Sequence, residues 1–376
     1  MKFLVILIIF FQFSYEVRSD HDKIIQDFHI WKKYEVKGLN KSYEFKKNLT
    51  KDKDVINEIQ NSKKTGLISY IFYHNDEIII DEQSLPEYVV KHNNLLLSNS
   101  MGKSLSSYIL GHAICEGYIK NVDVKLDDWS LLKNTLYEGQ SLIDVLNMQA
   151  GDHHIIGEKY GTRDVFLHGT SFNINTFPLK DVMELNMLRN SKKKSKVYNY
   201  NGLATNIILN YAIFKSGDNF QSLLDKIFRE KAKIKDNLYL HKSTRVNFLY
   251  PNSESAWFQF HATRYDYLRI SKTIMDDWNS DNCVGKYLKT IYERRIKKNF
   301  KDYNKSTHIH PYSYTYGGQF HFDLVGMRKR KLLGLDGWGG QQILIDVEKK
   351  AILVLHSTMN HYKWKKIVYN KFKNLE

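Results

Sequence analysis

Ser100 and Lys103 are the two residues of this chain whose types and spacing most directly suggest covalent chemistry. Residues i and i+3 of a helix share one face, with Cβ atoms about 5–6 Å apart. A serine hydroxyl becomes a good nucleophile only when a base removes its proton. A lysine amine one turn away can be that base where burial favours its neutral form. A helix-capping serine followed by a solvated lysine has the same spacing, so the pair alone does not decide between the two.

Two other interpretations of this segment are disfavoured. The sequence Gly-Lys-Ser at 102–104 resembles the end of a phosphate-binding loop, but that loop requires a glycine five positions before Gly102, and the chain has Leu97 there. The chain also contains no G-x-S-x-G segment, so the nucleophile elbow of the α/β-hydrolases is unsupported.

Two further segments carry residues suited to the same chemistry. Tyr200 directly precedes an apolar helical stripe, and a tyrosine held at a helix start beside a lysine can move a proton. Residues 337–341 (G-W-G-G-Q) lead into a strand, where adjacent glycines allow a substrate close to the backbone and exposed N–H groups can bind an oxyanion. An aromatic core contact and a simple glycine turn are the structural alternatives.

The elements expected to position these residues are two hairpins, one near each end of the chain, and helices between them. The first hairpin joins 66–73 to 78–80, and the second joins 342–347 to 351–355. Helices are predicted over 100–118, 203–214 and 258–278, with a terminal helix over 362–372. The predicted fold class is α+β, with an antiparallel sheet from both chain ends and an inserted helical region.

The N-terminus predicts export. A short positive start, an apolar stretch over 3–13 and small or apolar residues before Asp20 are typical of a secretory signal peptide at 1–19. An uncleaved anchor is the alternative. Residues 20–65 are polar and lysine-rich, and we expect a helical or irregular N-terminal arm. The main domain is predicted over 66–376, without stable membrane insertion after cleavage.

Composition adds little about function. The 376 residues carry a formal charge of +15, but the basic residues are dispersed, so a nucleic-acid partner is not expected. Cys115 and Cys283 fit no zinc spacing, and two core thiols are expected, with a disulfide as the open alternative. The segments 152–154 (D-H-H) and 308–310 (H-I-H) could supply metal ligands, but these histidines are expected instead to lie at the surface or to line a pocket. No metal or organic cofactor is predicted, and the oligomeric state is unknown.

Five segments, taken in order, resemble motifs of the β-lactamase and penicillin-binding-protein superfamily of serine hydrolases, most closely its esterase, class C and 6-aminohexanoate-dimer hydrolase branch. They are 100–104 (S-M-G-K-S), 146–151 (L-N-M-Q-A-G), 198–201 (Y-N-Y-N), 262–269 (A-T-R-Y-D-Y-L-R) and 337–341 with 345–346 (G-W-G-G-Q and I-D). The resemblance covers about residues 66–360 and implies the β-lactamase/transpeptidase-like fold.

The resemblance also implies roles. Ser100 would be the acylated nucleophile, Lys103 its base and Tyr200 the proton shuttle to the leaving group. The N–H groups of Ser100 and Gln341 would form the oxyanion hole. Asn201 would help to bind the acyl part of the substrate, and Trp338, Gly339 and Gly340 of the late-strand segment would also bind the substrate.

Three departures from the family pattern narrow the expected substrate. Members that process β-lactams carry Lys-Thr-Gly or His-Thr-Gly on the late strand to hold the substrate carboxylate, where this chain has Trp338 and two glycines. Gly202 replaces an asparagine, and Ala150 replaces a serine. The prediction is an exported serine hydrolase acting on a small ester or linear amide. A catalytically silent member that binds a peptide or glycan is the alternative, and a basic cell-surface adhesion protein is a third interpretation.

Overall fold

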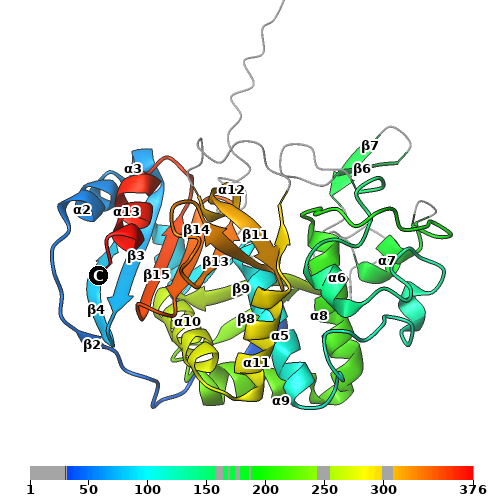
Figure 1. The fold of residues 1–376 in the computed structure, drawn as a ribbon. Helices are drawn as coiled ribbons and strands as arrows, with labels where there is room; N and C mark the ends of the chain where they lie inside the picture. The colour runs from blue at the N-terminus through cyan, green and yellow to red at the C-terminus, as the bar shows by residue number, and fades with distance from the viewer. Residues whose placement is uncertain are drawn as a thin grey trace, which may run out of the picture.

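A nine-stranded sheet forms the centre of the molecule, and strands from the two ends of the chain lie side by side in it (Figure 1). The computed structural model describes residues 30, 32–156, 164–167, 170–173, 178–185, 188–243, 255–298 and 308–375. The strand order is β10-β11-β12-β13-β14-β15-β3-β4-β2, and only the β2–β4 pair is parallel. The strands are β2 (Lys46–Lys47), β3 (Leu67–His74), β4 (Glu77–Gln83), β10 (Ile296–Lys297), β11 (Ser313–Gly317), β12 (Phe320–Leu324), β13 (Leu332–Gly337), β14 (Gln341–Asp346) and β15 (Ala351–Ser357).

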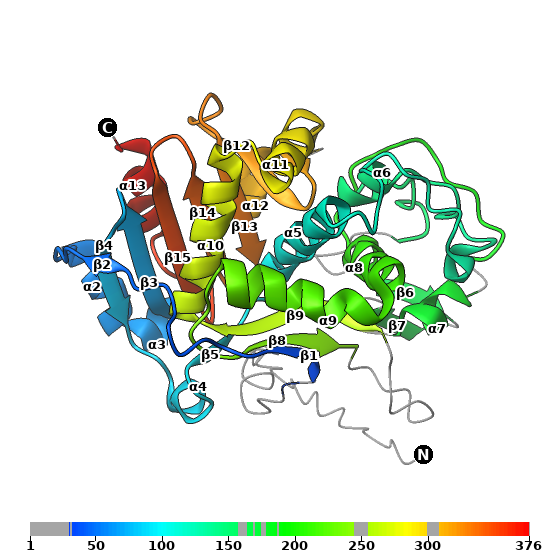
Figure 2. The same cartoon turned by 90° about the horizontal axis from the view of Figure 1, so that it is seen from below.

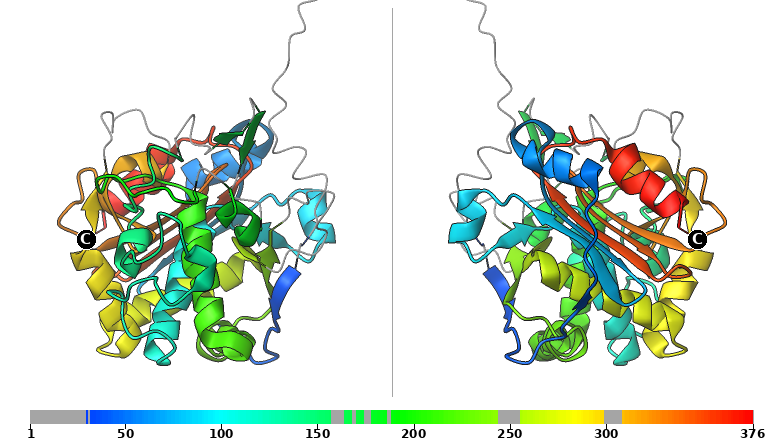
Figure 3. Two further views of the ribbon diagram at one scale, coloured as in Figure 1. Left: turned by 90° about the vertical axis from the view of Figure 1, so that its right-hand side faces the viewer. Right: turned by 90° about the vertical axis from the view of Figure 1, so that its left-hand side faces the viewer.

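Both predicted hairpins are confirmed, as β3–β4 and β14–β15, and the antiparallel pairing of β15 with β3 joins the two chain ends. Side chains of a strand alternate between faces. In β15, Leu353 and Leu355 pack with α2 (Lys53–Gln60) and the C-terminal helical turns, whereas Ile352 and Val354 belong to the core on the opposite face. Figure 3 shows α2 and the C-terminal helix on one face, and Figure 2 shows α10 (Arg264–Asn279) along the other.

A second, four-stranded antiparallel sheet carries the segments that enter α5 and α10. Its order is β1-β8-β9-β5. The strands are β1 (Lys32–Val36), β5 (Leu95–Leu97), β8 (Leu238–Lys242) and β9 (Ala256–Thr263). The prediction of one helix over 258–278 is therefore wrong in its first part. Residues 256–263 are extended because β8 and β5 supply their backbone partners, and α10 begins only where the Thr263 side chain accepts the N–H of Asp266.

The helices predicted over 100–118 and 203–214 are present as α5 (Met101–Cys115) and α8 (Gly202–Ser216). Helix α5 is buried on nearly all sides, between α8, α11 (Cys283–Glu293) and β9. The C-terminal helix consists of a π-helical turn, η5 (Lys365–Tyr369), followed by α13 (Asn370–Lys373). The remaining elements are α3 (Ser62–Thr65), α4 (Glu87–Lys91), η1 (Ser130–Leu132), α6 (Leu142–Leu146), β6 (Asp164–Leu167), β7 (Thr170–Asn173), α7 (Leu179–Met183), η3 (Gly217–Asn219), α9 (Phe220–Leu224), η4 (Asp225–Lys231) and α12 (Ile309–Tyr312).

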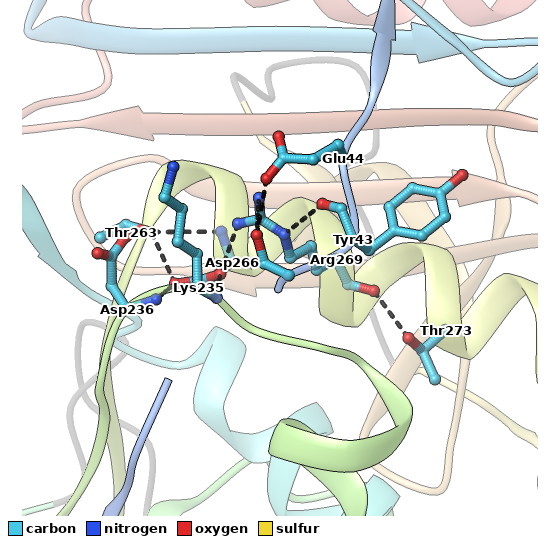
Figure 4. A network of polar contacts seen from close by, with 9 residues as sticks. Tyr43, Glu44, Lys235, Asp236, Thr263, Asp266, Arg269 and Thr273 are labelled. Atoms are coloured by element: carbon cyan, nitrogen blue, oxygen red, sulfur yellow. Dashed lines mark hydrogen bonds and ion pairs between the residues drawn. The ribbon is translucent and has the colours of Figure 1, made fainter. Parts of the chain in front are cut away.

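Residues 32–65, for which we expected a helical or irregular arm, contain strands β1 and β2 as well as helices α2 and α3, and they pack on the rest of the molecule. Figure 4 shows one of the contacts that hold this segment. The guanidinium of Arg269 donates from Nε to the backbone oxygen of Tyr43 at 2.9 Å and from Nη1 to Asp266 at 2.7 Å. Asp266 is fully buried near the start of α10. Because Arg269 binds both Asp266 and Tyr43, it connects the N-terminal arm to this helix.

Cys115 and Cys283 form a disulfide, with Cα atoms 5.7 Å apart, so the expectation of two free core thiols is wrong. The bond connects the last residue of α5 to the first residue of α11. Packing of these two helices brings together cysteines separated by 168 positions, which spacing along the sequence does not reveal.

Within the described ranges, no helix combines the length and the apolar character needed to cross a membrane. The predicted signal peptide at 1–19 lies outside the described residues.

Candidate active site

Ser100 lies at the N-cap of α5, and Lys103 follows one turn into the helix. The Nζ of Lys103 donates a hydrogen bond to Oγ of Ser100 at 3.1 Å. Ser100 is half-buried, whereas Lys103 is only 4% exposed. The pair is therefore in direct contact, with the amine inside the protein and the hydroxyl at the edge of the solvent.

Strand β9 positions the start of α5 by passing unusually close to it. The backbone N–H of Ser98 donates to Phe260 O at 2.8 Å, and Phe260 N–H donates to Ser98 Oγ at 2.9 Å. A Cβ at Gly102 would lie 1.8 Å from the backbone oxygen of Phe258, so only glycine fits in this first turn. Asn99, between Ser98 and the nucleophile candidate, has a left-handed φ of 46°.

Phe258 is a residue of the site that sequence reasoning missed, because its segment was placed in a helix. Its ring centroid lies 3.5 Å from the Nζ of Lys103, and the ring of Tyr200 lies 5.1 Å from the same atom. Two aromatic rings therefore line the surroundings of the amine. Aromatic faces attract an ammonium group, whereas burial opposes its charge, so the rings and the burial act on this amine in opposite directions.

Tyr200 is brought to the pair by the start of α8, as the sequence predicted. The next residue, Asn201, caps this helix by accepting the N–H of Ala204 at 2.7 Å. The ring of Tyr200 makes edge contacts with His310, at a centroid distance of 4.5 Å, and with Tyr316, at 5.9 Å. These contacts hold the ring in its position near Lys103.

Asp152 accepts hydrogen bonds from the two residues that flank Tyr200, Asn199 and Asn201. This fully buried carboxylate accepts from the side-chain amides of Asn199 at 2.6 Å and Asn201 at 3.1 Å, and from the hydroxyl of Tyr137 at 2.8 Å. The structure therefore gives Asp152 a structural role rather than the metal-ligand role weighed for the 152–154 segment. The side chain of Asn201 is 1% exposed and engaged in this network, so the geometry does not support its predicted contact with the acyl group.

The late-strand segment forms a tight turn between β13 and β14, beside the start of α5. Gly340 N–H donates to Gly337 O at 3.1 Å, and Gly339 supplies the positive φ of 83° that the third position of a type II turn requires. The carbonyl of Trp338 accepts from the side-chain amide of Asn99 at 2.8 Å. Trp338 is 54% exposed, so this turn beside the start of α5 carries an indole rather than a cation.

Gln341 begins β14 and pairs across the turn with Gly337. A Cβ at Gly337 would lie 2.8 Å from Ser98 O, so Gly337 and Trp338 are the turn residues next to the nucleophile segment. The role of the Gln341 N–H in an oxyanion hole stays a prediction.

Gln319 is a second residue that sequence reasoning missed. It lies in the turn between β11 and β12. Its backbone oxygen accepts from Ser104 of α5 at 2.6 Å, and its side-chain oxygen accepts from Thr205 of α8 at 2.8 Å. This contact sets the spacing of the two helices that carry Lys103 and Tyr200.

Comparison with known proteins is informative only for structure. No protein-family model matches the chain, and no curated protein matches its sequence. A protein from Bacillus anthracis that is described as a 6-aminohexanoate-dimer hydrolase superposes with a TM-score of 0.59 at 13% identity, covering 91% of this chain and 88% of that one. A protein from Bacteroides dorei that is described as a β-lactamase gives 0.59 at 15% identity, covering 86% and 99%. EstCE1, described as a hydrolase with promiscuous acyltransferase activity, gives 0.57 at 11% identity, covering 86% and 98%.

At these identities the likeness shows the fold. The chain has the fold of the β-lactamase and penicillin-binding-protein-like serine hydrolases, which confirms the fold that the resemblance implied.

Proposed function

We propose that this protein is a serine hydrolase that forms an acyl-enzyme on Ser100 and acts on a small ester or linear amide. The observation that carries the proposal is the 3.1 Å contact between Lys103 Nζ and Ser100 Oγ, with the lysine buried and Tyr200 beside it. The fold, shared with hydrolases, supports the reaction class. No step of this chemistry requires a metal or an organic cofactor.

The proposed reaction has two halves. The neutral amine of Lys103 takes the proton of Ser100 as Oγ attacks the carbonyl carbon, which gives a tetrahedral oxyanion. Tyr200 delivers a proton to the leaving alcohol or amine as the carbon–oxygen or carbon–nitrogen bond breaks, and Ser100 becomes acylated. Water then attacks the acyl-enzyme, gives up a proton through the same residues, and releases the acid while Ser100 is restored.

Negative charge that develops on the oxyanion would be stabilised at the start of α5. The Ser100 N–H lies at the N-terminus of a 15-residue helix, where the helix dipole favours negative charge. We propose the Gln341 N–H as the second donor, on the basis of the family resemblance and its place at the turn beside α5.

The substrate class follows from Trp338. A β-lactam needs a charge-assisted hydrogen bond to its carboxylate, which is worth about 1.5–3 kcal/mol or about a 10- to 150-fold rate effect. An exposed indole supplies no charge, whereas a neutral ester does not need one. p-Nitrophenyl butyrate should therefore be hydrolysed, and a chromogenic cephalosporin should show a kcat/KM lower by at least that factor. Equal efficiency on both would contradict this assignment.

Export is also proposed. It rests on the signal-like sequence at 1–19 and is supported by the Cys115–Cys283 disulfide, since disulfides persist mainly in oxidising compartments. N-terminal sequencing of the protein recovered outside the cytoplasm should begin at Asp20 or within about two residues of it, and an intact Met1 would contradict cleavage.

The central test is covalent labelling with a fluorophosphonate probe. Wild-type protein should be labelled on Ser100, and Ser100→Ala should lose labelling and ester hydrolysis while keeping its melting temperature. Ser106→Ala is a matched control, because it removes a buried hydroxyl of the same helix that donates to Gly102 O. Labelling that persists in Ser100→Ala would overturn the proposal. An unlabelled wild type would favour the catalytically silent alternative.

A further inference from the structure

Three side chains from three separate elements converge behind Tyr200. They are His310 of α12, His321 of β12 and Asp336 of β13, and their ligand atoms all lie within 4.8 Å of one another. In the sequence His310 is close only to His308, whereas His321 and Asp336 lie on later strands, 11 and 26 positions further along. None of the three has a part in the proposed hydrolysis.

The fold brings these groups together through the register of the sheet. His321 pairs with Gly334 across β12 and β13, and Asp336 lies two residues further along β13, so both side chains point to the same face. Helix α12 covers this face, and a Cβ at Gly334 would lie 2.5 Å from Ile309. The glycine therefore lets α12 approach until His310 lies above the pair.

Asp336 is the clearest sign that a ligand belongs here. It is 6% exposed, and within the described residues its Oδ1 has no hydrogen-bond partner, while Oδ2 accepts the N–H of His310 at 3.1 Å. A buried carboxylate oxygen without a partner is costly. A bound cation would remove the cost.

His321 is oriented as a ligating histidine usually is. Its Nδ1 lies 3.3 Å from Ser313 Oγ, and that hydroxyl lies 3.0 Å from the backbone oxygen of His310. If Nδ1 of His321 donates to Ser313, Nε2 keeps a lone pair for a ligand.

Lys298 is a buried lysine beside this cluster. Its Nζ donates to Ser313 Oγ at 2.5 Å and also to the backbone oxygen of His310. The lysine thus supports the Ser313 side of the cluster.

We propose that His310, His321 and Asp336 bind one zinc ion. Two imidazole nitrogens and one carboxylate oxygen are ligands that Zn²⁺ accepts in a tetrahedral site, and they leave the fourth position open. Ca²⁺ and Mg²⁺ prefer oxygen ligands alone and fit this set poorly. Bond lengths of about 2.0–2.2 Å require the three ligand atoms to draw together from their present separation, and His310 is the least buried of the three residues.

The zinc site would adjoin the proposed active site without being part of it. The His310 ring contacts the Tyr200 ring, with centroids 4.5 Å apart, and this contact is the link between the two sites. The inference concerns binding alone and goes beyond the proposed function, so it does not depend on whether Ser100 is a nucleophile.

The test is a titration of purified, disulfide-bonded protein with Zn²⁺ in competition with a chromogenic chelator. Wild type and Ser100→Ala should both bind one equivalent, which separates this inference from the hydrolase proposal. Asp336→Asn and His310→Gln should each weaken the site at least about tenfold. His154→Gln, which removes an exposed histidine, should leave the affinity unchanged.

Two measurements guard against misfolding and surface binding. Circular dichroism and the melting temperature of each variant without metal report folding, and His310→Gln is the milder change because His310 is only half-buried. Co²⁺ in place of Zn²⁺ should give visible absorption typical of tetrahedral coordination in wild type and lose it in folded Asp336→Asn. Absence of stoichiometric binding in wild type, or unchanged affinity in both folded variants, would overturn the inference.

Discussion

Lys103 is the residue whose surroundings most directly govern the proposed chemistry. A base must be neutral to accept the serine proton, and the Phe258 ring, 3.5 Å from Nζ, stabilises the charged ammonium instead. A desolvated cation–π contact is worth up to about 2 kcal/mol, which corresponds to about 1 pH unit or slightly more. Phe258 is therefore expected to set the lower pH limit of activity.

We predict that Phe258→Leu moves the acidic limb of the kcat/KM profile to lower pH by about 1 unit. Leucine keeps an apolar contact but removes the ring face, so the amine loses its proton at lower pH. The profile is measured with p-nitrophenyl butyrate. Phe260→Leu is the matched control, since it removes a ring of the same strand that packs against Phe228 instead. A limb that moves equally in both variants would contradict the assignment.

Asn201 shows how a helix end positions a site residue. Its side chain caps α8 and donates to Asp152, so Asn201→Ala removes the cap and one partner of a buried carboxylate. Loss of an N-cap costs about 0.5–2 kcal/mol, and the unpaired acceptor adds to this. We predict a loss of about 1–3 kcal/mol in the free energy of unfolding.

Asn201→Ser separates this role from substrate binding. Serine is also a good N-cap, so the Asn201→Ser variant should recover part of the lost stability in urea denaturation. KM for the ester should stay close to the wild-type value in this variant. A large rise in KM with unchanged stability in both variants would instead support a direct contact of Asn201 with the acyl group.

The Cys115–Cys283 disulfide connects the end of α5, the helix that carries Lys103, to α11. A disulfide that closes so long a loop stabilises mainly by restricting the unfolded chain, by roughly 2–5 kcal/mol. We predict that a variant with both cysteines changed to serine loses stability in this range, measured by urea denaturation. Reductant should lower the wild-type midpoint to that of the variant and leave the variant unchanged. A reductant effect of equal size on the variant would contradict this origin.

Local spacing was sufficient for the parts of the site that lie within one element. Ser100 and Lys103 share a helix face by the i, i+3 rule, and Tyr200 precedes a clear apolar stripe, so each could be placed from sequence. Phe258 could not, because its segment is buried on both faces and its buried positions include Gln259 and His261, so its hydrophobic pattern does not distinguish a helix from a strand. Pairing with β8 and β5, which is not local, decides its conformation.

Contacts between distant segments could not be predicted for the same reason. The residues Cys115 and Cys283 meet only because α5 packs on α11, and the approach of His321 to Asp336 depends on the register of β12 and β13. Residues 32–65 have a polar composition, yet their strands pair with β8 and β4. A polar composition predicts that such a segment is exposed to solvent. It does not indicate whether a sheet has an unpaired edge strand with which the segment can pair.

The molecule as a whole buries several histidines in neutral form, which ties its stability to pH. Burial lowers the pKa of His112, His241 and His356 to about 3. Because these folded-state values lie below the unfolded value near 6.5, the unfolded chain binds more protons between about pH 3 and 6.5. The stabilising contribution is complete above about pH 6.5 and is lost progressively as the pH falls below it.

His356 offers the sharpest test of this behaviour. It is 1% exposed, and neither ring nitrogen has a hydrogen-bond partner in the part of the chain that the structure describes. The charge of Arg264 adds to the effect of burial, which is the larger cause of its lowered pKa. Each such group contributes up to about 1.4 kcal/mol per pH unit to the loss of stability below about pH 6.5.

His356→Leu removes this group while keeping a buried side chain of similar size. We therefore predict that the free energy of unfolding falls less steeply from about pH 7 to about pH 5 in this variant than in wild type, as measured by urea denaturation. The exposed His154→Gln should follow the wild-type slope. Because all carboxylates are the same in the three proteins, their titration cancels in the comparison, and parallel slopes for wild type and His356→Leu would show that His356 is not held neutral by the fold.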